Sequence, residues 1–318
     1  MAPPKASRRS TLNEPDLLIA RNPDFMTFPK TLATRAPAKI NLTLHIEGRR
    51  LDGYHDLQSF VAFAGAGDLL SFEPAEHFEL TLEGPTATAA GDGGDNLVAR
   101  AERALRAERP DLLTGHFHLV KRLPVSAGIG GGSSDAAAAL RLLAEANGIA
   151  VNDPVLFDAA RKTGADIPVC MAPRAKFMRG VGEVLGPPMR LPPLFAVLVN
   201  PRLAVETREV FQKLGLKPGE TVDYGAHPVI AGNMDFESLL RALKKGRNDM
   251  EDAACVIAPV IGHVLSVLSA ARGCRLARMS GSGATCFALF ETCRQAGAAA
   301  RVISRGHPEW WVKPTVLR

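Results

Sequence analysis

The chain has 318 residues, a length that suggests two domains of ordinary size. Its 46% hydrophobic and 22% charged residues are typical of a soluble globular protein, and no apolar run reaches the roughly 18 residues that a membrane-spanning helix needs. Seven Lys or Arg residues against three acidic ones up to Lys39 account for about +4 of the net charge of +5, and only 6% of residues are aromatic. The sequence therefore disfavours nucleic-acid binding.

Residues 1–30 are rich in Pro, Arg, Ser and Asn without sustained periodicity, which predicts a flexible N-terminal extension. Glu14, Asp16 and Asp24 are unusual in a transit peptide, and there is no apolar core of a signal peptide. A plainer alternative is that translation starts at Met26.

The segment from Ala36 to Ile46 alternates strictly between apolar and other residues, which predicts a half-buried strand. Its apolar members would face the core, and Lys39 and Asn41 would face the opposite side. The patterns that follow predict, in chain order, a turn at 48–53, strands at 69–72 and 78–82, a helix from about 95 to 109 and a strand at 117–121.

A glycine-rich run, Gly128 to Ser134, lies between that last strand and an alanine-rich segment, 135–147, of high helix propensity. Glycines let backbone N–H groups approach an anion, and the start of a helix adds unpaired donors and the positive end of the helix dipole. Ser133 and Ser134 could cap this helix or offer hydroxyls to a phosphate and a metal ion. The pattern predicts an anion-binding loop and leaves its ligand open.

Two familiar phosphate loops do not fit this run. A Walker A loop needs a Gly-Lys-Ser/Thr sequence, and no lysine follows here. A dinucleotide fingerprint that starts at Gly128 needs a glycine at its sixth position, where the chain has Ser133. A flexible linker is the remaining alternative, and the helical alanine run directly after the glycines disfavours it.

The second half of the chain gives fewer signals. Its patterns predict a strand at 194–199, a helix at 207–214, a helical stretch at 248–271 and a strand at 286–290. The proline-rich segment from Gly186 to Pro193 predicts a domain boundary. Five scattered cysteines form no C-x-x-C pair and no zinc-type cluster, which is typical of reduced thiols in a cytoplasmic protein.

Three segments together resemble the signature motifs of the GHMP kinase superfamily: 36–42, 123–137 and 279–287. This resemblance implies an α+β fold of two domains, each a mainly antiparallel sheet covered by helices, with the active site in the cleft between them. Residues 31–185 would form the ATP-binding N-terminal domain, and residues 186–318 the C-terminal domain.

Four further segments, 50–55, 163–169, 180–183 and 248–251, resemble the branch of this superfamily whose acceptor is a cytidine diphosphate-linked methylerythritol. The resemblance implies ATP-dependent phosphorylation of the acceptor's 2-hydroxyl in the non-mevalonate route to isoprenoids. Alternatives are another kinase of the superfamily, of the mevalonate, homoserine or shikimate type, a non-catalytic nucleotide-binding protein, and a basic nucleic-acid-binding protein.

The resemblance also implies roles for individual residues. Lys39 and Asp166 would form the catalytic pair, in which the carboxylate takes the acceptor's proton and the ammonium balances developing negative charge. The expected ATP-binding residues are Pro124, Ser126, Gly128, Gly130, Gly131, Gly132, Ser133, Ser134 and Asn96. The expected substrate-binding residues are Asn41, Tyr54, His55, Thr207, Phe211, Gly281, Ser282 and Gly283. Mg²⁺ should accompany ATP, with Ser134 as the candidate protein ligand, and the protein should be a cytoplasmic monomer or homodimer that binds neither membrane nor nucleic acid.

Overall fold

The computed structural model describes residues 31–90 and 96–318. The predicted extension at 1–30 and the alternative start at Met26 lie outside the described residues. From Thr31 to Arg318 the chain forms one compact unit. No helix within the described ranges is long and apolar enough to span a membrane.

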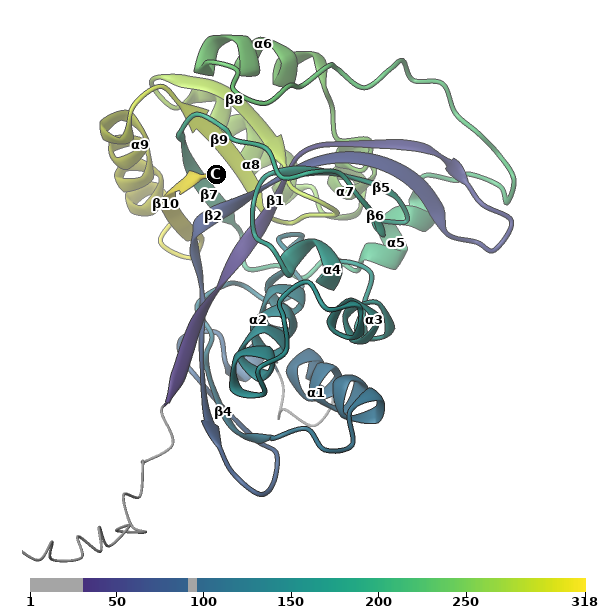
Figure 1. Cartoon of the computed structure of the whole chain (residues 1–318). Coiled ribbons are helices and arrows are strands. Elements are labelled where there is room, and N and C mark those ends of the chain that lie inside the picture. Colours follow the sequence, from purple (N-terminus) through teal and green to yellow (C-terminus); the bar gives the residue numbers. More distant parts are fainter. Residues whose placement is uncertain (1–30, 91–95) are drawn as a thin grey trace, which may run out of the picture. The chain divides into compact units, whose positions relative to one another are not determined.

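The first half of the chain builds a mainly antiparallel sheet around two long strands (Figure 1). β3 and β4 pair in parallel, and the other pairings in this sheet are antiparallel. Its strands are β1 (Leu32–Arg49), β2 (His55–Pro74), β3 (Glu79–Glu83), β4 (Gly115–Val120), β5 (Lys176–Gly180) and β6 (Val184–Leu185).

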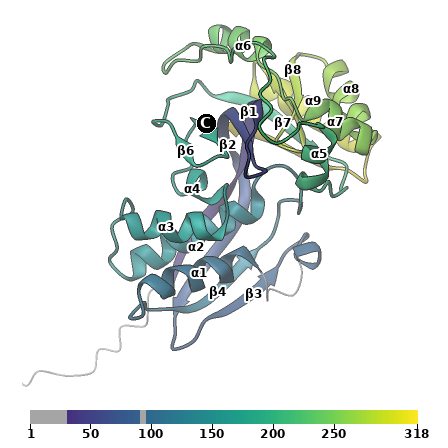
Figure 2. The same cartoon turned by 90° about the vertical axis from the view of Figure 1, so that its right-hand side faces the viewer.

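Helices cover one side of this sheet, as Figure 2 shows for the first three. Four consecutive alanines, 136–139, are fully buried in the second helix, and their small side chains let it pack closely against the first helix and β1. Asn96 caps the first helix by accepting a hydrogen bond from the N–H of Val98. These helices are α1 (Leu97–Glu108), α2 (Gly131–Ala146), α3 (Pro154–Thr163) and α4 (Ile167–Cys170), and a 3₁₀ turn spans Thr88–Ala90.

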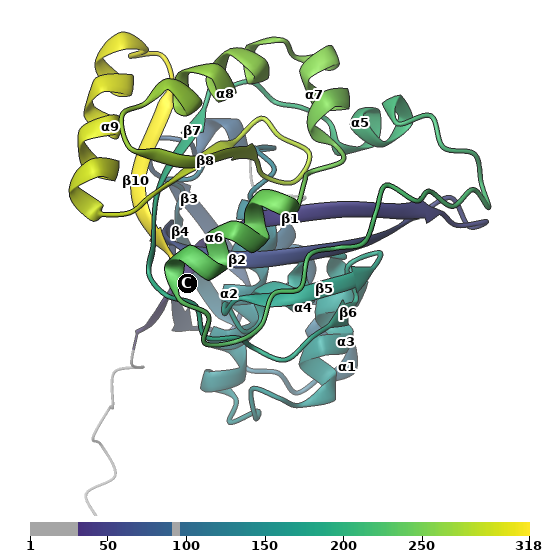
Figure 3. The same ribbon diagram turned by 90° about the horizontal axis from the view of Figure 1, so that it is seen from above.

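The second half builds an antiparallel sheet with helices on both faces. Its strands are β7 (Leu194–Asn200), β8 (Cys274–Met279), β9 (Cys286–Phe290) and β10 (Trp311–Leu317). Its helices are α5 (Thr207–Lys213), α6 (Phe236–Lys245), α7 (Glu251–Ile257), α8 (Val260–Ala270) and α9 (Cys293–Gly306). Figure 3 shows α6 and α8 on opposite sides of β8, and alternate residues of β7 and β9 accordingly belong to two different core clusters.

β1 and β2 connect the two halves. Leu317 of β10 pairs with Ala64 of β2, and Leu44 of β1 forms a bridge with Asn248. The predicted α+β fold, with mainly antiparallel sheet covered by helices in each half, is confirmed, and the pairing of β2 with β10 joins the two halves into one ten-stranded sheet. The predicted boundary between residues 185 and 186 falls in the segment between β6 and β7, and it stays a prediction.

Several elements differ from their predicted bounds. α2 begins at Gly131, inside the glycine run, because Gly130 adopts a φ of 60° directly before the helix. The helical stretch predicted at 248–271 is two helices, since Pro259 cannot supply the N–H that would continue α7. The amphipathic helices α6 and α9 were not predicted.

Candidate active site

A cavity of about 920 Å³ is lined by residues from both halves of the chain. It brings together nearly all of the residues expected from the sequence, although they lie far apart in the chain. Those that line it are Lys39, Asn41, Tyr54, His55, Asn96, Pro124, Ser126, Gly128, Gly130, Gly131, Gly132, Ser133, Asp166, Thr207, Phe211, Gly281 and Ser282.

The glycine run forms one wall of this cavity and opens directly into α2. Gly128 and Gly130 have φ angles of 70° and 60°, in the left-handed region that favours glycine. The first helical hydrogen bond runs from the Ser134 N–H to the Gly130 carbonyl at 2.8 Å, so earlier N–H groups of the helix start have no intrahelical partner. An anion at this point meets unpaired donors and the positive end of the helix dipole.

The Ser134 side chain does not take part in this wall. It is 1% exposed, and its hydroxyl donates to the Pro37 carbonyl oxygen at 2.6 Å. The expectation that this hydroxyl binds phosphate and a metal ion is therefore corrected. Ser133, one residue earlier, lines the cavity.

Lys39 and Asp166 meet at the foot of the glycine run. The Lys39 Nζ lies 2.8 Å from Asp166 Oδ2, and Asp166 is part-exposed to the cavity. Lys39 is held on β1 by a bond from its backbone N–H to the Ile129 carbonyl oxygen at 2.9 Å, and its stem passes beside Gly130. A carboxylate and an ammonium thus share the space next to the loop, where they can bind an alcohol and the phosphoryl group that it receives.

The turn at 280–283 packs directly onto the glycine run. The Ser280 hydroxyl accepts from the Asn41 N–H at 3.0 Å and donates to the Gly128 carbonyl oxygen at 3.1 Å. One buried serine therefore joins β1, the phosphate loop and this turn. Gly283 does not line the cavity; it contacts Gly128 instead.

The far end of the cavity is aromatic. The rings of His55 and Phe211 stack with centroids 4.5 Å apart, whereas Tyr54 is 63% exposed. Burial, and then the charge of Arg49, lower the pKa of His55, so its ring is neutral near pH 7. Its buried Nε2 has no hydrogen-bond partner among the described residues. A flat ligand at this end could stack on the aromatic rings and form a hydrogen bond with the unpartnered Nε2 of His55.

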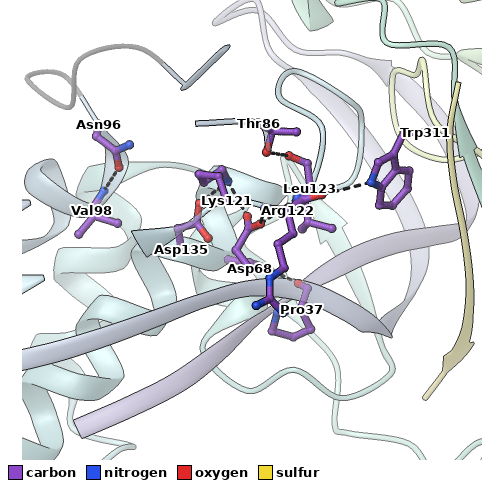
Figure 4. Close-up of polar contacts among 11 residues, drawn as sticks. Pro37, Asp68, Thr86, Asn96, Val98, Lys121, Arg122, Leu123, Asp135 and Trp311 are labelled. Atoms are coloured by element: carbon purple, nitrogen blue, oxygen red, sulfur yellow. Dashed lines mark hydrogen bonds and ion pairs between the residues drawn. The ribbon is translucent and has the colours of Figure 1, made fainter. Parts of the chain in front are cut away.

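No sequence pattern predicted a buried ionic group beneath the loop. Lys121 Nζ lies 2.5 Å from Asp68 Oδ2 and 2.7 Å from Asp135 Oδ2, and all three side chains are almost fully buried (Figure 4). Asp68 also accepts from the N–H groups of Arg122 and Leu123. The group thereby ties β2, the end of β4 and the first turns of α2 together.

The charge of this group is unbalanced, with two carboxyls to one ammonium. Burial, with a contribution from Asp68, raises the pKa of Asp135 to about 7, although Lys121 opposes the shift. The Oδ1 atom of Asp135 has no hydrogen-bond partner among the described residues. Near neutral pH this carboxyl is thus poised between its two protonation states.

Asp135→Asn should change how stability depends on pH. Between about pH 4 and pH 7 the folded protein holds the Asp135 proton more tightly than the unfolded chain does, so this carboxyl makes the free energy of unfolding fall as pH rises. The amide cannot ionise, so the stability of the variant relative to the parent should rise across this range. Urea unfolding at pH 4, 5.5 and 7 measures this difference. Asp158→Asn, at an exposed site, is the control, and a difference that stays constant with pH would contradict the assignment.

Comparisons with known proteins identify the class. The family described as "GHMP kinases N terminal domain" matches residues 96–173, and "GHMP kinases C terminal" matches residues 231–309. The fold is also that of a homoserine kinase from Cytophaga hutchinsonii, with a TM-score of 0.64 at 17% identity over 92% of this chain and 97% of that one. The fold is that of a GHMP kinase.

Relatives of higher sequence identity show which family within the GHMP kinases this chain belongs to. 4-diphosphocytidyl-2-C-methyl-D-erythritol kinase of Methylobacterium radiotolerans is 56% identical over 288 residues, which are 90% of this chain and 99% of the relative. The same enzyme of Xanthobacter autotrophicus is 56% identical over 292 residues, again 90% and 99%. A crystal structure of 4-(cytidine 5′-diphospho)-2C-methyl-D-erythritol kinase matches with a TM-score of 0.71 at 33% identity over 90% of this chain and 99% of that one. The chain belongs to the 4-diphosphocytidyl-2-C-methyl-D-erythritol kinase family.

Proposed function

We propose that the protein transfers the γ-phosphoryl group of ATP to the 2-hydroxyl of 4-diphosphocytidyl-2-C-methyl-D-erythritol, with Lys39 and Asp166 at the reacting atoms. The observation that carries the proposal is the 2.8 Å ion pair of these two side chains at the foot of the phosphate loop. High identity to kinases of that name over nearly their full length supports the choice of acceptor.

The chemistry follows from the positions of the groups. The phosphate loop and the α2 N-terminus hold the ATP phosphates, so the γ-phosphoryl group lies near Lys39. Asp166 accepts the proton of the acceptor's hydroxyl, and the Lys39 ammonium stabilises negative charge on the transferring group. Because phosphoryl transfer has a loose transition state, positioning and charge neutralisation supply most of the rate.

At the other end of the cavity, the stacked pair of His55 and Phe211 is suited to the cytosine. Base stacking on an aromatic ring contributes about 1–3 kcal/mol, and the unpartnered His55 Nε2 could bond to the edge of the base. Tyr54, which lines the same cavity, would cover the other face of the base. Thr207, whose hydroxyl lies 2.8 Å from that of Ser282, would contact the rest of the acceptor.

The residues present fit a Mg²⁺ ion that arrives with ATP. The described residues hold no cluster of three or more His, Cys, Asp or Glu side chains, and Mg²⁺ bound to a nucleotide needs only one or two protein oxygens. The Ser133 hydroxyl and the unpartnered Asp135 Oδ1 supply such oxygens at the loop. When bound, the ion would neutralise charge on the phosphates.

Five free cysteines support a reducing, cytoplasmic compartment. The absence of nucleic-acid binding and the monomeric or homodimeric state stay predictions.

A coupled ADP-release assay tests the function. With a panel of acceptor alcohols, we expect activity with the cytidine diphosphate compound and at least about 10²-fold less with mevalonate or homoserine, which leave the aromatic end of the cavity unfilled. EDTA should stop ADP release and excess Mg²⁺ should restore it. A preference for mevalonate would overturn the choice of acceptor, and activity that persists in EDTA would overturn the role of the metal ion.

A further inference from the structure

A second cavity, of about 1090 Å³, lies among β1, β2, α2 and β10. Five cationic side chains line it, and no Asp or Glu of the described ranges does so. These cations come from distant points in the chain: Arg35, Arg122, Arg141, Lys313 and Arg318.

The cations of this cavity lack carboxylate partners within the described residues. Arg141 donates to the carbonyl oxygens of Cys170 and Arg35, each at 2.9 Å, and Arg35 donates to the Gly65 carbonyl oxygen. Burial lowers the pKa of Arg141, which reflects the cost of its charge at this depth. Like charges gathered in one concave site repel each other, and a bound anion would relieve that repulsion.

One wall of this cavity is aromatic. Trp311, Lys313 and Thr315 alternate along β10, so their side chains share one face of the strand. The Trp311 indole N–H donates to the Arg122 carbonyl oxygen at 3.2 Å, and the Thr315 hydroxyl accepts from the Ala66 N–H at 3.1 Å. The indole is therefore fixed beside the cations, where it offers a flat surface to a ligand.

This cavity is separate from the catalytic one. No residue lines both, and the segment 121–124 runs between them: Lys121 and Pro124 line the catalytic cavity, and Arg122 and Leu123 line the basic one. Figure 4 shows Arg122 and Leu123 between Trp311 and the ionic group of Lys121. A ligand of the basic cavity would thus touch the segment that leads into the phosphate loop, without entering the site of phosphoryl transfer.

We propose that this basic cavity is a second ligand site, for a small phosphorylated molecule with an aromatic or apolar body. The guanidinium groups bind the phosphate through charge-assisted hydrogen bonds, and the body packs on Trp311. The volume of the cavity exceeds that of a bare phosphate ion and suits a ligand with such a body.

Tryptophan fluorescence tests this site, because Trp311 lines the cavity and the chain has only one other tryptophan, Trp310. The probe is naphthyl phosphate, titrated into the full chain, and Trp311 lines the basic cavity but not the catalytic one. We expect saturable quenching that inorganic phosphate competes away, that naphthol does not reproduce, and that is largely lost in Trp311→Phe.

Matched double variants locate the binding. Arg122→Ala/Lys313→Ala removes two cations of the cavity through exposed side chains and should weaken naphthyl phosphate binding about tenfold or more. Arg294→Ala/Arg301→Ala removes two exposed cations of α9 that do not line the cavity and should leave binding unchanged. Absence of saturable quenching, or equal weakening in the two double variants, would overturn the proposal.

Discussion

Replacing Asp166 with Asn should lower kcat by about 10²-fold or more, the scale of a positioned proton acceptor. The amide keeps the size of the side chain and can still accept a hydrogen bond from Lys39, but it cannot take the acceptor's proton. Asp166 makes no capping hydrogen bond to α4, so the substitution should leave the fold and the KM for ATP unchanged. Steady-state kinetics with ADP release, and nucleotide binding by calorimetry, measure both quantities.

Asp111→Asn is the control for this variant, because Asp111 is exposed and lies outside the cavity. It should retain parental kinetics. Near-normal turnover of Asp166→Asn with intact ATP binding would refute the proposed role of this carboxylate, whereas loss of ATP binding would show that the substitution disturbs the phosphate loop instead.

Gly128→Ala should lower kcat/KM for ATP by about 10²-fold, because the phosphate loop would be displaced. A Cβ at this position would lie 2.5 Å from the Ser280 carbonyl oxygen and 2.6 Å from that of Gly283. Both are backbone atoms that cannot rotate aside, so the loop and the turn must separate. The φ of 70° adds strain of about 1–2 kcal/mol for any residue with a Cβ.

The variant Gly148→Ala distinguishes the backbone strain of a positive φ from the steric collision of the added Cβ. Gly148 has a φ of 63°, and nothing lies within 4 Å of its added Cβ, so this variant carries the strain without the collision. Urea unfolding should show a loss of about 1 kcal/mol for Gly148→Ala and a loss larger by roughly 1–3 kcal/mol for Gly128→Ala. Equal losses, with ATP kinetics intact in both variants, would contradict the tight packing of the two glycine turns.

The features that were predictable from sequence are local ones. Alternation placed Lys39 and Asn41 on one side of β1, and both line the catalytic cavity. The side-chain direction of Ser134 was not predictable, because its hydroxyl bonds to Pro37, almost a hundred residues earlier in the chain. Likewise, the end of α7 follows from a local proline, but the packing of α6 and α9 depends on the opposite faces of a sheet assembled from distant strands.

The clustering of charged side chains in the folded protein was the least predictable property. The basic residues after the N-terminal segment look scattered in the sequence, yet the fold collects five of them around one cavity. Lys121, Asp68 and Asp135 are equally dispersed, and their burial as one ionic group depends on the register of β2 and β4 and the approach of α2. Coulombic partners of this kind arise from topology, which no local pattern encodes.

The contact between the two glycine turns also constrains mutagenesis libraries. Gly128 and Gly281 make room for each other: a Cβ on Gly281 would lie 2.6 Å from the Gly128 carbonyl oxygen. Since glycine is already the smallest residue, enlargement at one position has no compensating reduction at the other. Libraries that randomise the cavity to change its acceptor should therefore keep both glycines fixed and place diversity at the aromatic end, where Tyr54 is exposed and its replacement should cost the fold little.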